Sequence, residues 1–217
     1  MSANRLAALT GLAFLVLVVL STIVLGDVPD PKDDAPLKII NFYKDNDSEV
    51  YISALLSGLA ATALVFFAAY LGKVLRAASG PGHMLSFVPL AGASIVAVAA
   101  GIDATINIAL VEAVDDIQPA AVQSLSALWS NDWFTFVVGG TIFMLAAGLS
   151  IVRHGGLPVW MGWIAILLAV VSATPAGFVG FIGAGLWVAV ASVILFLRAD
   201  QPGVTGAAPP PAATTPA

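Results

Sequence analysis

The segment Leu85–Val114, LSFVPLAGASIVAVAAGIDATINIALVEAV, is long and apolar enough to cross a membrane as one helix. It also carries Asp103 and, one helical turn later, Asn107. No other apolar segment of the chain holds an ionisable residue away from its ends. Membrane-crossing length decides the fold class, and the embedded polar pair indicates where a site is to be sought.

The composition of the whole chain is that of a membrane protein. Of 217 residues, 59% are hydrophobic and 10% are charged, and the mean hydropathy is +0.99. Soluble domains carry about 25% charged residues, so a soluble core is excluded. The apolar residues come in runs of about 20, the length that crosses about 30 Å of hydrocarbon. The chain contains no cysteine, which excludes disulfides, thiolate metal sites and cysteine nucleophiles.

The apolar runs predict an all-α bundle of six transmembrane helices. Their expected bounds are about 6–26, 50–71, 85–112, 133–152, 158–173 and 177–197. The first run follows Arg5, as in a cleaved signal peptide, but it exceeds the roughly 7–15 apolar residues of such peptides. A retained first span is therefore favoured. Pro175 is expected to make a turn, because the last two runs would otherwise merge into one helix too long for a single crossing.

Two polar outer loops, residues 27–49 and 112–132, each contain a segment with helical spacing. In the first loop, Pro36 suits a helix start, and Leu37, Ile40 and Tyr43 recur on one side. That helix would lie on the membrane surface or close over the bundle as a lid. In the second loop, residues 120–129 show apolar residues at helical spacing. Residues 1–198 form the predicted transmembrane domain, and residues 199–217, rich in Pro, Ala and Thr, predict a disordered cytoplasmic tail.

The charges predict a cell-membrane protein with both termini in the cytoplasm. The outer loops hold three lysines, whereas the inner segments hold five cations: Arg5, Lys73, Arg76, Arg153 and Arg198. Each inner cation adjoins a span end, where the positive-inside rule has most force. All 13 acidic residues except Asp103 and Asp200 fall in the two outer loops.

Asp103 and Asn107 form the candidate site. One face of the third helix carries, in order, Gly92, Val96, Ala99, Asp103 and Asn107. Asn107, at position i+4, is within hydrogen-bonding reach of the Asp103 carboxyl. No Lys, Arg or His lies inside any span, so a buried Asp103 is expected to be protonated. Three interpretations stay open: a structural hydrogen bond, a position at the outer interface, and a ligand, ion or proton site.

Small residues recur at helix-packing spacing on three predicted spans. The stripes are Ala54, Gly58, Thr62; Ala97, Gly101, Thr105; and Ala176, Gly180, Ala184. Close packing of helices explains such stripes. Because the chain is rich in Ala and Gly, such spacing also arises by chance and is weak evidence for a dimer.

Several functional classes find no support in the sequence. The chain contains no HExxH, Gly-x-Ser-x-Gly or phosphate-binding loop motif, so no enzyme and no cofactor is expected. His83 and His154 fall at inner turns without accompanying carboxylates, so no metal site is predicted. A net charge of −5 argues against nucleic-acid binding.

The favoured functional prediction is a non-enzymatic accessory subunit. Its partners would be the lipid bilayer and either another membrane protein or a second copy of the chain. The alternative is a small transporter or channel that uses Asp103 and Asn107. The sequence offers neither a clear inverted repeat nor paired broken helices, which many transporters show.

The layout resembles small six-span membrane proteins of unknown function from high-GC bacteria such as actinobacteria. The resembling stretches are DVPDPKDDAPLKIINFYKDN at residues 27–46, LSALWSNDWF at 125–134 and GLPVWMGWIAILL at 156–168. The resemblance covers residues 6–198 and implies the six-span topology. It implies no activity and no site residue.

Overall fold

The computed structural model describes residues 2–80, 83–174 and 177–199. All regular elements in these ranges are helices, which confirms the predicted all-α class for the described part of the chain. They are α1 (Ala3–Leu25), α2 (Pro36–Asp45), α3 (Asp47–Ser79), the short 3-10 helix η1 (Met84–Ser86), α4 (Val88–Ala113), α5 (Pro119–Trp129), α6 (Trp133–His154), α7 (Val159–Ser172) and α8 (Gly177–Arg198). Apart from Ala199, the predicted tail lies outside the described residues, as does Pro175.

Five helical stretches among the described residues have the length and apolar composition to cross a membrane. They are Ala3–Leu25, Asp47–Ser79, Met84–Ala113, Pro119–His154 and Gly177–Arg198. The chain is therefore a multi-pass membrane protein, as predicted. The expected fifth span corresponds to α7, which is apolar but has 14 residues. At 1.5 Å per residue it is about 21 Å long, short of a full crossing.

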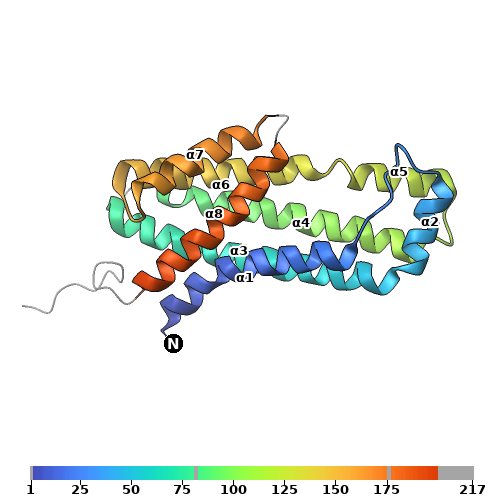
Figure 1. The fold of residues 1–217 in the computed structure, drawn as a ribbon, viewed down its shortest axis with the longest axis horizontal. Coiled ribbons are helices and arrows are strands. Elements are labelled where there is room, and N and C mark those ends of the chain that lie inside the picture. Colours follow the sequence, from blue (N-terminus) through green and yellow to red (C-terminus); the bar gives the residue numbers. More distant parts are fainter. Residues whose placement is uncertain (1, 81–82, 175–176, 200–217) are drawn as a thin grey trace, which may run out of the picture.

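The long helices form a closed antiparallel ring. In the order α1, α3, α4, α6, α7 and α8 each helix packs against the next, and α8 packs against α1. Helix α7 runs back along α6, so α1 begins and α8 ends at the same end of the bundle (Figure 1). Because α7 and α8 are separate helices, the merged long helix is ruled out.

Glycine allows the closest approach between α4 and α6. A Cβ atom added to Gly92 would lie 2.4 Å from the backbone nitrogen of Phe143, and one added to Gly139 would lie 2.8 Å from that of Val96. The predicted stripe containing Gly180 also packs, against Ser172 of α7.

The other two stripes do not pack against a helix within the described part of the chain. An added Cβ at Gly58 or at Gly101 would meet nothing within 4 Å, and both residues lie on the exposed surface of the bundle. Small residues at the right spacing are present on these faces, but no helix of the described chain covers them. The spacing of small residues on one helix therefore did not identify the helix pairs in contact.

A helical cap covers one end of the bundle. It consists of α2 and α5, which pack on each other and on the C-terminal end of α4. Its core includes Tyr43 from α2, Leu110 from α4 and Val122 from α5, all fully buried. Leu37, which helical spacing placed on the apolar face of α2, is 65% exposed, and Ile39 is buried instead. Helix α3 has 33 residues, about 50 Å, so it extends beyond a hydrocarbon layer of about 30 Å toward this cap.

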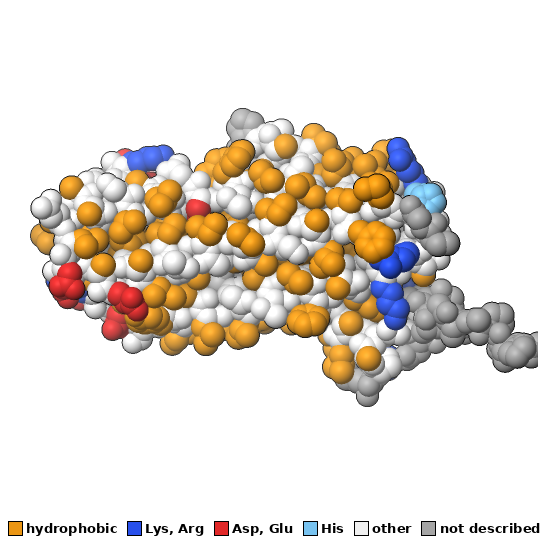
Figure 2. All heavy atoms as spheres, turned by 180° about the vertical axis from the view of Figure 1, so that it is seen from behind, with side chains coloured by type: hydrophobic (Ala, Val, Ile, Leu, Met, Phe, Trp, Pro, Cys, Tyr) orange, Lys and Arg blue, Asp and Glu red, His pale blue; other side chains and the backbone are white. Residues whose placement is uncertain are grey.

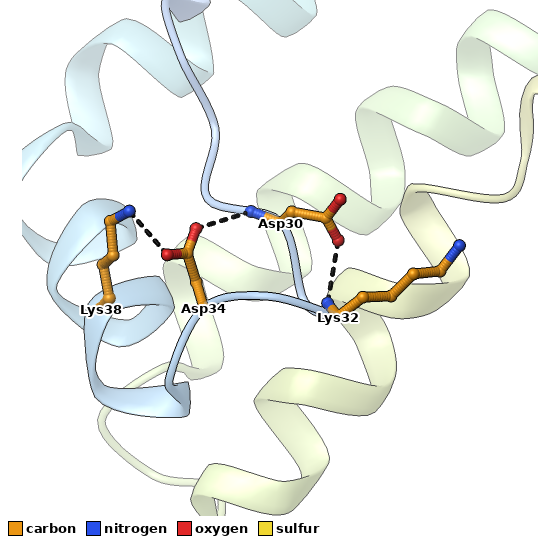
Figure 3. A network of polar contacts seen from close by, with 4 residues as sticks. All are labelled: Asp30, Lys32, Asp34 and Lys38. Atoms are coloured by element: carbon orange, nitrogen blue, oxygen red, sulfur yellow. Dashed lines mark hydrogen bonds and ion pairs between the residues drawn. The ribbon is translucent and has the colours of Figure 1, made fainter.

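Polar contacts order the first outer loop. The Lys38 ammonium donates to Oδ1 of Asp34 at 2.7 Å, and Oδ2 of Asp34 accepts the backbone N–H of Asp30 at 3.0 Å (Figure 3). Oδ1 of Asp30 accepts the backbone N–H of Lys32 at 2.8 Å (Figure 3). The hydrogen bond from Lys38, helped by its positive charge, holds the pKa of the partly exposed Asp34 carboxyl below its usual value. These contacts set the path of the chain into α2.

Two further contacts join the first outer loop to the second. The ammonium of Lys44 on α2 pairs with the carboxylate of Asp115, and the side-chain amide of Gln123 on α5 donates to the carbonyl of Pro31 at 3.1 Å. The cap is therefore held by polar contacts at its surface as well as by its apolar core.

Candidate functional site

Asp103 lies on α4 beneath the cap. It follows Val88 by 15 residues, about 22 Å along the helix, and its side chain is half-buried. The indole Nε1–H of Trp129, the last residue of α5, donates to Oδ1 of Asp103 at 2.6 Å. The cap thus supplies a hydrogen-bond donor to the carboxyl group that the sequence singled out.

Asn107 does not bond to the Asp103 carboxyl, contrary to the prediction. Its amide N–H donates to the backbone carbonyl of Asp103 at 3.1 Å, because a side chain at i+4 reaches the carbonyl one turn earlier. Its Oδ1 accepts the hydroxyl of Tyr43 on α2 at 3.1 Å. Asn107 is 3% exposed, and the hydrogen bond to its Oδ1 joins the cap to α4 while its N–H bonds within α4. The two predicted site residues therefore have different surroundings.

Tyr43 on α2 is the residue of the cap that bonds to Asn107. The residue is fully buried. Burial, with a smaller contribution from the charge of Asp103, raises the pKa of the Tyr43 phenol above its usual value. The hydroxyl therefore stays protonated and remains a donor to Asn107 throughout the physiological pH range.

A cavity of about 760 Å³ lies beside Asp103. Residues from α1, α3, α4, α6 and α8 form its walls, and Trp129 together with residues 26–28 lies at its cap end. Helices α1 and α8 meet near the opposite end of the bundle, where the Ser192 hydroxyl donates to the carbonyl of Ala8 at 2.5 Å and accepts the N–H of Leu12 at 3.1 Å. Toward the cap the two helices diverge (Figure 1). Residues of both helices line the cavity, among them Thr22 of α1 and Phe178 of α8.

Three carboxylates line this cavity. They belong to Asp27 after α1, Asp103 on α4 and Asp132 before α6. Oδ2 of Asp132 is buried and has no hydrogen-bond partner among the described residues. Of the described lining residues none is Lys, Arg or His. The cavity therefore brings three acidic side chains together without an internal basic partner.

The remaining wall is mostly apolar and rich in aromatic rings. The lining aromatics are Phe14, Trp129, Trp133, Phe136, Phe178 and Phe181. Phe136 of α6 and Phe181 of α8 form an edge-to-face pair with ring centroids 6.1 Å apart. The polar hydroxyls of Ser21 and Ser53, which join α1 to α3 at 2.9 Å, also lie on the wall. Carboxylates at one end of an aromatic chamber resemble the general build of small-molecule sites.

Sequence reasoning identified Asp103 but missed Asp132 and the role of Trp129. In the sequence Trp129 is one residue of a segment with helical spacing, and Asp132 is one acid among those of the second outer loop. The signal available was their place in LSALWSNDWF, where an acid and two tryptophans directly precede a span. That pattern is local, whereas the convergence of α5 and α6 on Asp103 is a tertiary contact.

The two histidines lie together at the end of the bundle opposite the cap. The rings of His83 and His154 have centroids 4.5 Å apart. Within the described ranges, no group of three His, Cys, Asp or Glu side chains is placed to hold a metal ion. The histidine pair by itself supplies too few ligands for a structural metal centre.

Residues 9–213 match the model of a family described as "Domain of unknown function (DUF4386)". No curated protein and no solved structure matches the chain. The match agrees with the predicted resemblance to proteins of unknown function, and the likeness to actinobacterial proteins in particular stays a prediction. The comparison assigns no activity, so the function must be argued from the site.

Proposed function

The chain belongs to the DUF4386 family, a domain of unknown function, and we propose that it is a non-enzymatic six-span protein that binds a small ligand beneath its cap. The observation that carries this proposal is the cavity of about 760 Å³ bordered by Asp103 and Asp132. Small-molecule sites have volumes of about 300–1,000 Å³, with apolar walls and a few converging polar groups. This cavity has that size and that composition.

The geometry of α6 supports an assignment of the membrane boundaries. From Trp133 to Arg153 the helix rises about 30 Å over 20 residues, the thickness of the hydrocarbon core. The basic residue at one end and the tryptophan at the other would then mark the two interfaces. Asp132 and Asp103 would lie at the outer boundary, and the cap would stand outside the hydrocarbon.

The same assignment supports six spans in the cell membrane with cytoplasmic termini. Helix α7 is then the fifth crossing, a short one for which local thinning of the bilayer compensates. On the visible face, Asp and Glu side chains gather toward the cap end together with a smaller basic group, whereas the opposite end shows Lys, Arg and His without acidic side chains (Figure 2). The positive-inside rule puts that basic end in the cytoplasm.

Transport is the second candidate function, and one observation favours it. Asp103 borders a cavity within the helix ring, as an intramembrane carboxylate of a transport pathway would. Asn107 drops out of that proposal because it is buried, does not line the cavity and bonds to Tyr43 and to the backbone of α4. The accessory-subunit interpretation stays a prediction. Exposed apolar side chains would point to a protein partner in water, but in a membrane lipid covers them.

The test uses cysteine labelling, for which the cysteine-free chain needs no background removal. Ala100 lines the cavity and is 5% exposed, whereas Val98 on the same helix is 60% exposed on the outer face of the bundle. An impermeant maleimide is applied to intact cells that express Ala100→Cys, Val98→Cys or, as the marker of the outer side, Asp33→Cys. We expect labelling of the Ala100→Cys variant, because water reaches the cavity, and of the Asp33→Cys variant in the outer loop. We expect no labelling of the Val98→Cys variant, because lipid shields that position.

Each other pattern has a definite meaning. Labelling of Asp33→Cys without Ala100→Cys would contradict a water-filled cavity and with it the proposed function. Labelling at both helix positions would place this part of α4 in the outer interface. Absence of labelling at Asp33→Cys, together with labelling after permeabilisation, would reverse the proposed orientation.

A further inference from the structure

The charge of the cavity restricts the ligands that it can hold. Trp129 donates to one oxygen of Asp103, while Oδ2 of Asp132 is buried without a partner among the described residues. A buried carboxylate without a counter-charge is unfavourable, and a positively charged ligand removes that cost. An anionic ligand would instead add to the repulsion, because the described lining contains no basic side chain.

The apolar wall argues against a bare metal ion as the occupant. Hard cations take six or more oxygen ligands, and the wall beyond the carboxylates consists largely of rings and aliphatic side chains. The hydroxyls of Ser21 and Ser53 are already bonded to each other. An ion at the carboxylates would leave most of the 760 Å³ empty, whereas an organic group would fill it.

The aromatic rings suit a cation that carries apolar substituents. A ring face attracts a positive charge within about 6 Å of its centroid, most strongly when water is excluded. Phe14 lines the cavity from α1, and the edge-to-face pair of Phe136 and Phe181 lines it from α6 and α8. Organic ammonium and phosphonium ions match this wall because their charge is spread over apolar groups.

Toward the cap, α1 and α8 both border the cavity. The two helices are joined at Ser192 near the basic end, and toward the cap Thr22 and Phe178 line the cavity from opposite sides. Phe178 is 76% exposed, so the rim faces the surroundings of the bundle. In the membrane orientation argued above, those surroundings are the outer leaflet.

We infer that the cavity binds a hydrophobic organic cation, which reaches it from the outer leaflet between α1 and α8. The inference rests on the proposed ligand-binding function and names the class of ligand. The charged centre of the ligand lies between Asp103 and Asp132, and its apolar groups lie against Phe136 and Phe181.

The test compares two ions of the same shape and opposite charge, tetraphenylphosphonium and tetraphenylborate. The full chain is held in phosphatidylcholine nanodiscs, and binding is measured by equilibrium dialysis with empty nanodiscs subtracted. We expect saturable binding of the phosphonium ion at least tenfold tighter than that of the borate. The variants Asp103→Asn and Asp132→Asn should each weaken phosphonium binding about tenfold or more.

The control is Asp116→Asn, which removes one exposed acidic charge at the same end of the molecule but outside the cavity. Its affinity should equal that of the wild type. Weaker binding by Asp132→Asn is not expected to come from misfolding, because the buried Oδ2 of Asp132 makes no hydrogen bond that the substitution would remove. Equal binding of the two ions, or unchanged phosphonium affinity in both cavity variants, would overturn the inference.

Labelling of the Ala100→Cys variant separates this inference from the proposed function. Phosphonium should protect that position from the maleimide. If the cysteine at position 100 is labelled but tetraphenylphosphonium neither binds the protein nor protects this cysteine, the proposed ligand class is wrong, while the proposal of a ligand-binding cavity is kept. If the position is not labelled at all, both proposals fail.

Discussion

Two glycine substitutions on the same helix should change the stability in opposite directions. In Gly92→Ala the new Cβ would lie 2.4 Å from the nitrogen of Phe143 and 2.8 Å from the carbonyl oxygen of Gly139. Both atoms are backbone atoms of α6, so no side-chain rotation relieves the clash. In Gly101→Ala the new Cβ would have no atom within 4 Å.

The magnitudes follow from these distances. Ordinary contacts lie at about 3.5–4.0 Å, so α4 and α6 must separate by about 1 Å at Gly92. Overpacking of this kind costs about 1–3 kcal/mol, and rigid backbone on the opposing side favours the upper part of that range. Gly101→Ala removes no contact and gains up to about 1 kcal/mol of helix propensity.

The assay is thermal unfolding of the purified protein in one detergent, followed by the loss of the monodisperse peak in size-exclusion chromatography. The two variants differ from the wild type by the same methyl group on the same helix, so detergent and expression effects cancel. We expect a lower melting temperature for Gly92→Ala and an equal or higher one for Gly101→Ala. Equal melting temperatures for the two variants would refute the close α4–α6 crossing on which the cavity geometry depends.

Three further predictions concern the cap. Tyr43→Phe leaves the buried Oδ1 of Asn107 without its donor and should lower the free energy of unfolding by about 1–3 kcal/mol, measured by thermal unfolding. The control Tyr51→Phe, at an exposed tyrosine, should change it by less than about 0.5 kcal/mol. Burial raises the pKa of Tyr43 in the folded state. The wild type should therefore lose stability relative to Tyr43→Phe as the pH rises above about 10, because the phenol ionises in the unfolded chain but not in the folded one. A difference in melting temperature that does not change with pH would contradict a buried phenol. The pair of Lys44 and Asp115 is solvent-exposed. A double-mutant cycle should therefore give a coupling free energy below about 1 kcal/mol that falls with added salt. A larger coupling would show that the contact between the two loops depends on this ion pair.

The sequence determined the environment of the chain. Uninterrupted apolar runs must lie in lipid, because an aqueous protein of this composition would have no polar surface. The spacing of apolar residues also predicted both cap helices, α2 and α5, because the 3.6-residue period is a property of each segment alone. Asp103 was found in the same way, since one carboxylate inside an apolar run is conspicuous without any knowledge of its neighbours.

The partners of Asp103 and Asn107 required the tertiary structure. Trp129 and Tyr43 reach them from helices that lie far along the chain in sequence, on the two sides of the cap. Helical spacing correctly put Asn107 within reach of Asp103, but it could not choose between the carboxyl and the backbone carbonyl as acceptor. The burial of Asn107 beside Tyr43 decided that choice.

The sequence therefore determined that the chain lies in a membrane, where its helices run and which carboxylate stands apart. Only the tertiary structure decided that Gly92 and Gly139 make the close crossing while Gly58 and Gly101 do not, and that α1 and α8 diverge around a cavity. The physical reason is that lipid and helix neighbours are both apolar, so the hydropathy of a residue does not tell which of the two it faces. The pairing of helices depends on shape complementarity between distant segments, which no pattern within one segment records.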